Sequence, residues 1–196
     1  MNQMDKNLEG KKVLITGAGP GIGHAIAKLL LQLGATVIAV SRNIQNQEKL
    51  ILETQSSNLA CWAIDLSTEE GQQLFSKKLD NSGYPHIVIN NLNIITPKKR
   101  LINFSKMELV ENFTVNMDHL FVIMEKTVQF QRTEKYGRWI GISSMAAHIS
   151  IPGQSLYAAQ KSMMETFFMN LAVEEGKYGI TAKIVCPGYI KTPSFT

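Results

Sequence analysis

Two side chains towards the C-terminus are spaced so that they could do acid–base chemistry together. Tyr157 and Lys161 stand four residues apart in a stretch of helical character, which places a phenol and an ammonium group on one helical face. A phenol has a pKa of about 10 and exchanges protons poorly near neutral pH, but a nearby cation lowers that pKa. The pair predicts a proton-transferring tyrosine tuned by a lysine. An ordinary helix with a surface tyrosine and lysine has the same spacing, so other parts of the sequence must decide.

Apolar runs and helical repeats alternate along the whole sequence. Short runs of β-branched and aliphatic residues predict six strands, and the segments between them have apolar residues at helical spacing. Strands linked by helices pair in parallel through right-handed crossovers. The expected fold is α/β: one domain over residues 1–196 with a doubly wound parallel sheet, the Rossmann fold. The predicted strands are 12–16, 35–40, 59–64, 86–89, 138–142 and 180–185, and the predicted helices are 22–33, 44–54, 67–79, 105–131 and 155–178.

A glycine-rich turn follows the first predicted strand at once. Glycines at positions 17, 19, 21 and 23 let backbone N–H groups come close to a phosphate at the start of the next helix. Glycine also marks ordinary turns, but the strand before this turn and the amphipathic helix after it favour dinucleotide binding.

Polar or glycine-rich residues end every predicted strand. In a doubly wound sheet these ends meet at one edge, where ligands bind, so we expect one shared site there. Ser41 and Arg42 end the second strand, where NAD-binding proteins usually have Asp or Glu for the ribose hydroxyl. A guanidinium suits a 2′-phosphate instead, which favours NADP(H) over NAD(H). The alternative is a solvated arginine at the start of a loop.

These motifs together resemble the short-chain dehydrogenase/reductase family, in its larger subfamily. They occur in the family's order over nearly the whole chain: Thr16 with the glycines to Gly23, Asp65, Asn90 and Asn91, Asn116, Ser144, Tyr157 with Lys161, and Pro187-Gly188 with Thr192. The resemblance implies an oxidoreductase that transfers a hydride between NADP(H) and a carbonyl or secondary alcohol.

The resemblance also implies a role for each matched residue. Tyr157 would exchange a proton with the substrate oxygen, and Lys161 would hold the nicotinamide ribose and lower the Tyr157 pKa. Ser144 would hydrogen-bond the carbonyl, and Asn116 would hold a water in a proton relay. Besides Tyr157 and Lys161, the expected cofactor contacts are Gly17, Gly19, Pro20, Gly21, Ile22, Gly23, Ser41, Arg42, Asp65, Leu66, Asn91, Pro187, Gly188, Ile190 and Thr192.

The composition is typical of a packed globular protein. Of 196 residues, 44% are hydrophobic and 18% charged, so extended disorder is not expected. The net charge of +4 is scattered, whereas nucleic-acid binding uses a concentrated basic face. The N-terminus lacks an apolar signal core, and no apolar run approaches the ~20 residues that cross a bilayer. We expect a cytoplasmic protein that binds neither nucleic acid nor membrane.

Neither a disulfide nor a metal site is expected. Cys61 and Cys186 lie far apart in apolar runs, which is typical of reduced core thiols, and no His or Cys cluster has metal-ligand spacing. Because the tyrosine already fills the proton-transfer role, His24 and His148 are interpreted as bystanders, with His148 a candidate for the pocket wall.

Apolar residues suggest the substrate and a partner. Ile94, Ile95, Ile149, Ile151 and Tyr189 would form an apolar substrate pocket. Helix 155–178 is apolar around much of its surface, and the family resemblance implies that part of it packs on a second subunit, giving a homo-oligomer, either a dimer or a tetramer.

The sequence also departs from the family pattern. Leu92 and Asn93 follow Asn91 where the family usually has Ala-Gly, and Lys183 stands where asparagine is common. The family usually continues beyond a position equivalent to Thr196 with a mobile segment, a seventh strand and a terminal helix. The alternative function is therefore a non-catalytic NADP(H)-binding or interaction protein, left inactive by the missing C-terminal part.

Overall fold

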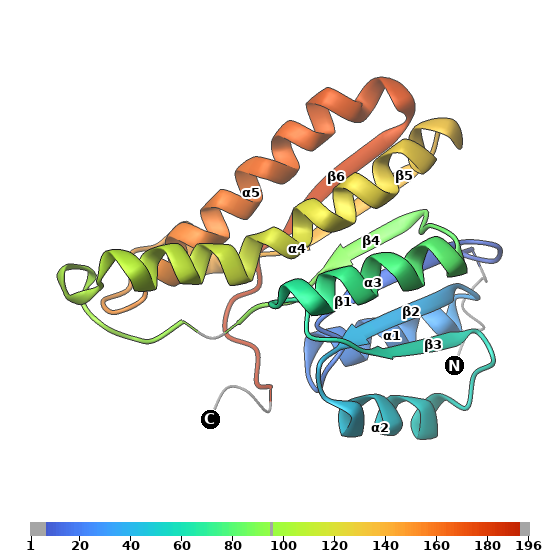
Figure 1. Cartoon of the computed structure of the whole chain (residues 1–196), viewed down its shortest axis with the longest axis horizontal. Coiled ribbons are helices and arrows are strands. Elements are labelled where there is room, and N and C mark those ends of the chain that lie inside the picture. The colour runs from blue at the N-terminus through green and yellow to red at the C-terminus, as the bar shows by residue number, and fades with distance from the viewer. Residues whose placement is uncertain (1–6, 95, 193–196) are drawn as a thin grey trace.

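The computed structural model describes residues 7–94 and 96–192, which form helices packed on both faces of a parallel sheet (Figure 1). The sheet has the strand order β3-β2-β1-β4-β5-β6, and every neighbouring pair is parallel. The strands are β1 (Lys12–Thr16), β2 (Thr36–Ser41), β3 (Leu59–Ala63), β4 (Ile87–Asn90), β5 (Gly137–Ile142) and β6 (Ile180–Val185). The predicted doubly wound α/β class is confirmed.

The chain reverses its direction across the sheet between β1 and β4. It runs outward from β1 through β2 to β3 and then returns to place β4 on the other side of β1. Thr16 and Asn90 pair at the carboxyl ends of these two strands. The loops after β1 and β4 therefore leave in opposite directions, and open α/β sheets bind ligands in the crevice between such loops.

Side-chain caps fix where most of the helices begin. The helices are α1 (Ile22–Gln32), α2 (Ile44–Thr54), α3 (Glu69–Ser82), α4 (Lys106–Thr133) and α5 (Ser155–Glu175). Asn43 caps α2, and Ser105 forms a capping box with Glu108 at the start of α4. Thr68 caps α3 rather than Ser67, because the Ser67 hydroxyl donates instead to the Asp65 carboxylate at 2.6 Å.

Two hydrophobic clusters, one on each face of the sheet, hold the layers together. On one face, Ala27 and Leu30 of α1 and Leu50 of α2 pack with alternate residues of the central strands. On the other face, α3, α4 and α5 pack with the remaining alternate residues, and Trp139 of β5 is fully buried there. This alternation is the one expected of strands covered on both faces. Figure 1 shows α3, α4 and α5 on one side of the sheet and α1 behind it.

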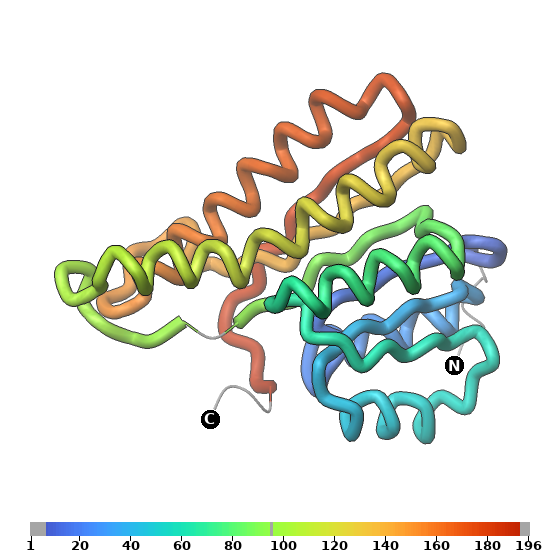
Figure 2. Tube along the Cα trace, in the orientation of Figure 1, coloured from blue at the N-terminus to red at the C-terminus, as the bar shows by residue number. Residues whose placement is uncertain are grey.

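Helix ends and one apolar position differ from the sequence-based expectation. Helix α5 ends at Glu175 rather than residue 178, because Gly176–Tyr178 tightens into a 3-10 turn before Gly179 at φ +75°. Leu109, whose helical spacing from the other apolar residues of α4 predicts an interior position, is 40% exposed. The N-terminal end of α4 extends past the strands of the sheet (Figure 2).

Within the described residues, no helix has both the length and the hydropathy of a membrane span. Cys61 and Cys186 are free, half-buried thiols; Cys61 packs against the core, as predicted, whereas Cys186 is not among the core residues.

Candidate active site

Two connected clefts open at the carboxyl edge of the sheet. The larger, of about 580 Å³, runs past the glycine turn, the end of β2 and the segment after β4. The second, of about 330 Å³, lies between Ser144 and the segment Pro187 to Thr192. Ile22, Asn93, Tyr157 and Thr192 line both, so Tyr157 stands where the two clefts join. A small cavity of about 60 Å³, lined by Asp65 and Leu66, continues the larger cleft beyond Arg42.

The glycine turn forms the floor of the larger cleft. Gly17 has φ +66°, and a Cβ there would lie 2.8 Å from the Leu92 Cα. A Cβ on Gly23 would lie 2.2 Å from the Gly17 carbonyl oxygen. Larger residues would therefore fill the cradle or push α1 away from the sheet.

The start of α1 carries no negative charge of its own. As at α5, no side chain caps it and its first turn has no acidic residue, whereas α2, α3 and α4 each begin with a capping side chain. The positive end of the helix dipole thus faces the cleft without a built-in anion. This arrangement fits a dinucleotide pyrophosphate.

Lys161 lies buried beneath the junction of the clefts. It is 4% exposed, its Nζ donates a hydrogen bond to the Ile142 carbonyl at 3.0 Å, and the same atom is 5.8 Å from the centre of the Tyr157 ring. Burial lowers the pKa of Lys161 to about 8, and the Glu165 carboxylate opposes that shift. The side chain is therefore mostly an ammonium at neutral pH, which places a positive charge beside the phenol.

Ser144 and Asn116 hold backbone segments around the same junction. The Ser144 hydroxyl accepts the Ala146 N–H at 3.2 Å and starts the short turn η2 (Met145–Ala147), and Ser144 also lines the second cleft. Asn116 is 3% exposed; its Oδ1 accepts the Ile94 N–H at 2.7 Å and its Nδ2 donates to the Asn112 carbonyl at 2.9 Å. Asn116 thus ties α4 to the segment after β4 and lies behind the cleft surface.

The end of β2 places a cation at the edge of the larger cleft. The Arg42 side chain is 69% exposed, and its guanidinium is 3.9 Å from the Asp65 carboxylate. Ser41 is buried, and its carbonyl accepts a hydrogen bond from Gln47 Nε2 at 3.0 Å. Arg42 can therefore turn towards a bound anion, whereas Ser41 is held in place.

Most of the predicted site residues lie on these clefts. The larger cleft and its small extension are lined by Gly17, Gly19, Pro20, Ile22, Gly23, Ser41, Arg42, Asp65, Leu66, Asn91, Tyr157 and Thr192. Pro187, Gly188 and Ile190 line the second cleft with Ser144. Lys161 and Asn116 lie behind these surfaces. Gly21 packs against the Thr192 side chain, and a Cβ added to Gly21 would lie 3.3 Å from that side chain.

The second cleft is lined by other residues than the predicted isoleucines, and its lining mixes apolar and polar side chains. Its polar lining residues include Asn93, Thr96, Lys98 and Gln154. Five residues were predicted to line the pocket, and the four of them that the structure describes do not line this cleft. Ile149 and Tyr189 are 46% and 80% exposed, Ile94 lines the small cavity next to Asp65, and Ile95 lies outside the described residues. Ile149 and Ile151, in the loop between β5 and α5, are not among the residues that line the cleft.

Sequence reasoning missed several polar residues of the site. Asn43 and Asn46 line the larger cleft beside Arg42. His119 of α4 is fully buried, with Nε2 2.9 Å from Asn90 Oδ1, which also accepts the Thr16 hydroxyl at 3.1 Å. Burial, with a smaller effect of Lys161, lowers the pKa of His119 to about 4, so a neutral imidazole supports the ends of β1 and β4. Asn43 could have been found as the residue after Arg42, but nothing in the helical pattern marks His119.

A family model described as short chain dehydrogenase matches residues 11–196. The chain belongs to the short-chain dehydrogenase family. Among its relatives, the 3-oxoacyl-[acyl-carrier-protein] reductase FabG of Pseudomonas aeruginosa is 34% identical over 190 residues, which are 95% of this chain and 76% of the reductase. The hydroxynaphthalene reductase-like protein Arp2 of Metarhizium acridum is 32% identical over 98% of this chain and 73% of its own.

Solved structures of other family members superpose closely on this short-chain dehydrogenase. Levodione reductase matches with a TM-score of 0.85 and 28% identity, over 95% of this chain and 74% of its own. A Tyr-to-Phe variant of ElxO with NADPH bound matches with a TM-score of 0.81 and 26% identity, over 94% and 75%. By family, the chain is an oxidoreductase that acts on carbonyl or alcohol groups.

Proposed function

We propose that this short-chain dehydrogenase interconverts a carbonyl and a secondary alcohol with NADP(H), and that Tyr157 transfers the proton. The observation that carries the proposal is the buried ammonium of Lys161 beside Tyr157, at the junction of a cleft that fits a dinucleotide and a second cleft. When bound, the nicotinamide supplies or accepts the hydride.

Residues of the chain then transfer the proton and hydrogen-bond the substrate oxygen. In the reducing direction, the Tyr157 hydroxyl gives its proton to the substrate oxygen as negative charge develops there, and Ser144 donates a second hydrogen bond. The phenolate left on Tyr157 is favoured by the Lys161 ammonium, because charges interact more strongly in a partly buried site than in bulk water. Asn116 keeps the segment after β4 fixed to α4 at the rear of the site.

Replacing Tyr157 by phenylalanine tests the central assignment. The variant should lose turnover with a panel of ketones and alcohols, because it keeps the ring and removes only the hydroxyl, and it should bind NADPH with nearly unchanged affinity by nucleotide fluorescence. Retained turnover would remove Tyr157 from the mechanism. Binding of NADPH by the unmodified chain with no turnover on any compound would instead support the non-catalytic alternative.

The preference for NADP(H) rests on Arg42, whose exposed fork of donors can meet a 2′-phosphate. The match to a structure with NADPH bound supports the same preference. A hydrogen-bonded charge pair contributes about 1.5–3 kcal/mol, so Arg42→Ala should weaken NADPH binding about tenfold or more and leave NADH binding little changed. Arg100→Ala, at an exposed loop arginine, is the matched control. Equal weakening of both nucleotides by Arg42→Ala would contradict this role.

The substrate and the assembly are proposed in outline. The second cleft, at about 330 Å³, is near the lower end of the range for small-molecule sites and has mixed polarity, which suits a small carbonyl compound with an additional polar group. Phe121 of α4 and Met169 and Val173 of α5 are 51%, 58% and 83% exposed, which supports association of two chains through these helices. Light scattering of the purified chain would measure this association.

A further inference from the structure

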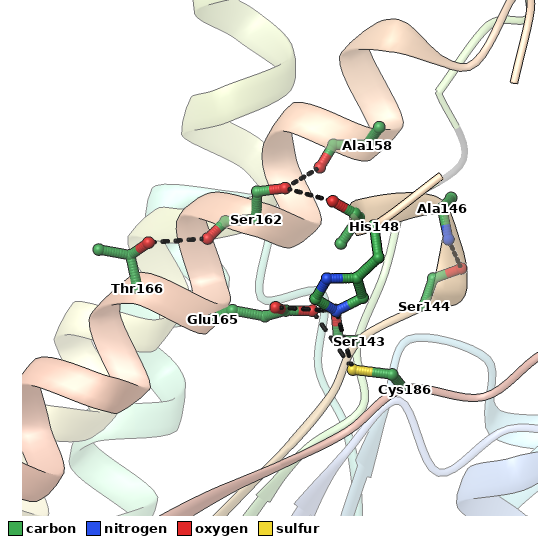
Figure 3. A network of polar contacts seen from close by, with 10 residues as sticks. Ser143, Ser144, Ala146, His148, Ala158, Ser162, Glu165, Thr166 and Cys186 are labelled. Carbon is green, nitrogen blue, oxygen red and sulfur yellow. Dashed lines mark hydrogen bonds and ion pairs between the residues drawn. The ribbon is translucent and has the colours of Figure 1, made fainter. Parts of the chain in front are cut away.

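Three side chains from separate segments converge behind the active-site junction. His148 follows η2, Glu165 lies on α5 one turn beyond Lys161, and Cys186 follows β6 (Figure 3). The His148 Nε2 is 3.2 Å from Glu165 Oε2, and the Cys186 Sγ is 3.4 Å from Glu165 Oε1 and 3.5 Å from His148 Nε2. An imidazole, a carboxylate and a thiol thus direct their polar atoms towards one point.

These three groups are close enough together to bind one metal ion. Zinc binds sulfur at about 2.3 Å and nitrogen or oxygen at about 2.0–2.1 Å in tetrahedral geometry. A tetrahedron with those bond lengths places sulfur about 3.5 Å from nitrogen or oxygen, and nitrogen about 3.3 Å from oxygen. The 3.5 Å between Cys186 Sγ and His148 Nε2 agrees with the first value. The Glu165 carboxylate faces the thiol with Oε1 at 3.4 Å and the imidazole with Oε2 at 3.2 Å, and one ligand atom from each residue lies within 4.8 Å of the others.

The arrangement does not fit a nucleophilic triad, which is the other chemistry of this residue set. In a triad the base takes the nucleophile's proton with one ring nitrogen and is oriented by the acid through the other nitrogen. Here the same atom, His148 Nε2, faces both the carboxylate and the thiol. One Nε2 proton can serve only one of these neighbours, whereas a metal ion can bind all three groups.

The surroundings supply further features of a metal site. The Ser143 hydroxyl donates a hydrogen bond to Glu165 Oε1 and so fixes the carboxylate, as outer-shell partners do around metals. The Glu165 side chain is 12% exposed, and His148 is its ion-pair partner within the described residues. The His148 side chain is 49% exposed, which leaves a path for entry and a fourth position for solvent.

We propose that His148, Glu165 and Cys186 form a zinc-binding site. The mixture of thiol, imidazole and carboxylate favours zinc over magnesium or calcium, which prefer oxygen ligands alone. A bound ion would join the ends of β5 and β6 to α5, the three segments that carry Ser144, Pro187 and Lys161. Its occupancy would therefore control how firmly the active-site wall is held.

Metal titration of the full chain tests the site independently of turnover. Chelator-treated protein is titrated with Zn²⁺ in competition with a chromophoric chelator, and separately with Co²⁺, whose bond to a thiolate gives a charge-transfer absorption. We expect one Zn²⁺ per chain, a thiolate band with Co²⁺, and a higher melting temperature with Zn²⁺. Loss of an outer-shell partner alone weakens metal binding about 10–100-fold, so Cys186→Ala and His148→Gln should each weaken it by at least about tenfold.

Matched controls separate this site from adventitious binding. Cys61→Ala removes the other free thiol, and His24→Gln removes a histidine that lies 3.0 Å from Glu53 with no thiol beside it. Both should leave the Zn²⁺ affinity unchanged. His148→Gln alters a half-exposed side chain and so keeps the test valid if Cys186→Ala folds poorly. The proposal is overturned if the unmodified chain binds no stoichiometric Zn²⁺, if Co²⁺ gives no thiolate band, or if the control variants weaken binding as much as His148→Gln.

Discussion

Replacing Lys161 by methionine should stabilise the folded chain while it removes activity. Burial lowers the pKa of Lys161 from 10.5 to about 8. Each pKa unit corresponds to about 1.4 kcal/mol, so keeping this ammonium charged in the folded state at neutral pH costs about 3 kcal/mol. Methionine has a similar length and no charge, but it gives up the hydrogen bond from the ammonium to the Ile142 carbonyl, and such a charged hydrogen bond is worth about 2 kcal/mol. The free energy of unfolding should therefore rise by about 1 kcal/mol.

The pH dependence distinguishes this effect from ordinary repacking. The pKa of Lys161 is lower in the folded chain than in the unfolded chain. Between about pH 8 and 10.5, Lys161 therefore keeps its proton in the unfolded chain and has released it in the folded chain. The stability contribution of Lys161 thus rises with pH across that window, whereas methionine has nothing to titrate. The advantage of the variant should be largest below about pH 8 and should shrink as the pH approaches 10.5.

Urea unfolding followed by circular dichroism at a series of pH values measures the difference. Lys77→Met on α3 is the matched control, because Lys77 is exposed and its replacement removes an equal charge without a burial cost. If Lys161→Met were less stable than the unmodified chain near neutral pH, by an amount that did not change with pH, the buried ammonium would not carry the cost assigned to it.

Two further predictions concern the glycine turn and the core around β1 and β4. Gly23→Ala should destabilise the chain by about 1–3 kcal/mol or more, because the new Cβ would lie 2.2 Å from the Gly17 carbonyl oxygen. Gly176→Ala is the control. A Cβ there has no neighbour within 4 Å, so this variant should be neutral or slightly stabilised in the same denaturation assay. The pKa of His119 is lowered to about 4, so the unfolded chain takes up a proton below about pH 6.5 that the folded chain refuses, and up to about 3 kcal/mol of stability should be lost by about pH 4. His119→Gln should lack this component of the acid-side loss, and parallel pH curves for the two chains would contradict it.

The sheet could be predicted from the sequence because the strand propensity of each segment agrees with its burial in the fold. Strands buried on both faces read as continuous apolar runs, and β1 and β6 have the predicted limits. Helix α5 was predicted three residues too long, since Gly176 keeps helical angles at φ −55° and the change to a 3-10 turn depends on tertiary packing. Leu109 looked buried because helical spacing records a face of the helix and does not record how far the sheet extends beneath it.

The site was less predictable wherever side chains from distant segments meet. The glycine turn, Arg42 and the Tyr157–Lys161 pair could be placed at one edge because each follows a strand or lies on a helix next to it. Ile149 could not be placed, because the direction of a loop side chain depends on what packs around it. His148, Glu165 and Cys186 lie on three segments with no regular spacing, so only the folded chain brings them together.

Backbone-to-backbone packing makes the floor of the larger cleft rigid before any nucleotide arrives. No side chain separates Gly17 from Gly23, and the Asn91 Nδ2 donates a hydrogen bond to the Gly17 carbonyl at 2.7 Å. A backbone with so little conformational freedom loses little conformational entropy when a ligand binds, so the glycine turn is preorganised. Substitutions at Thr192, which lies beside Gly21 and lines both clefts, should therefore change nucleotide association rates more than substitutions in the turn.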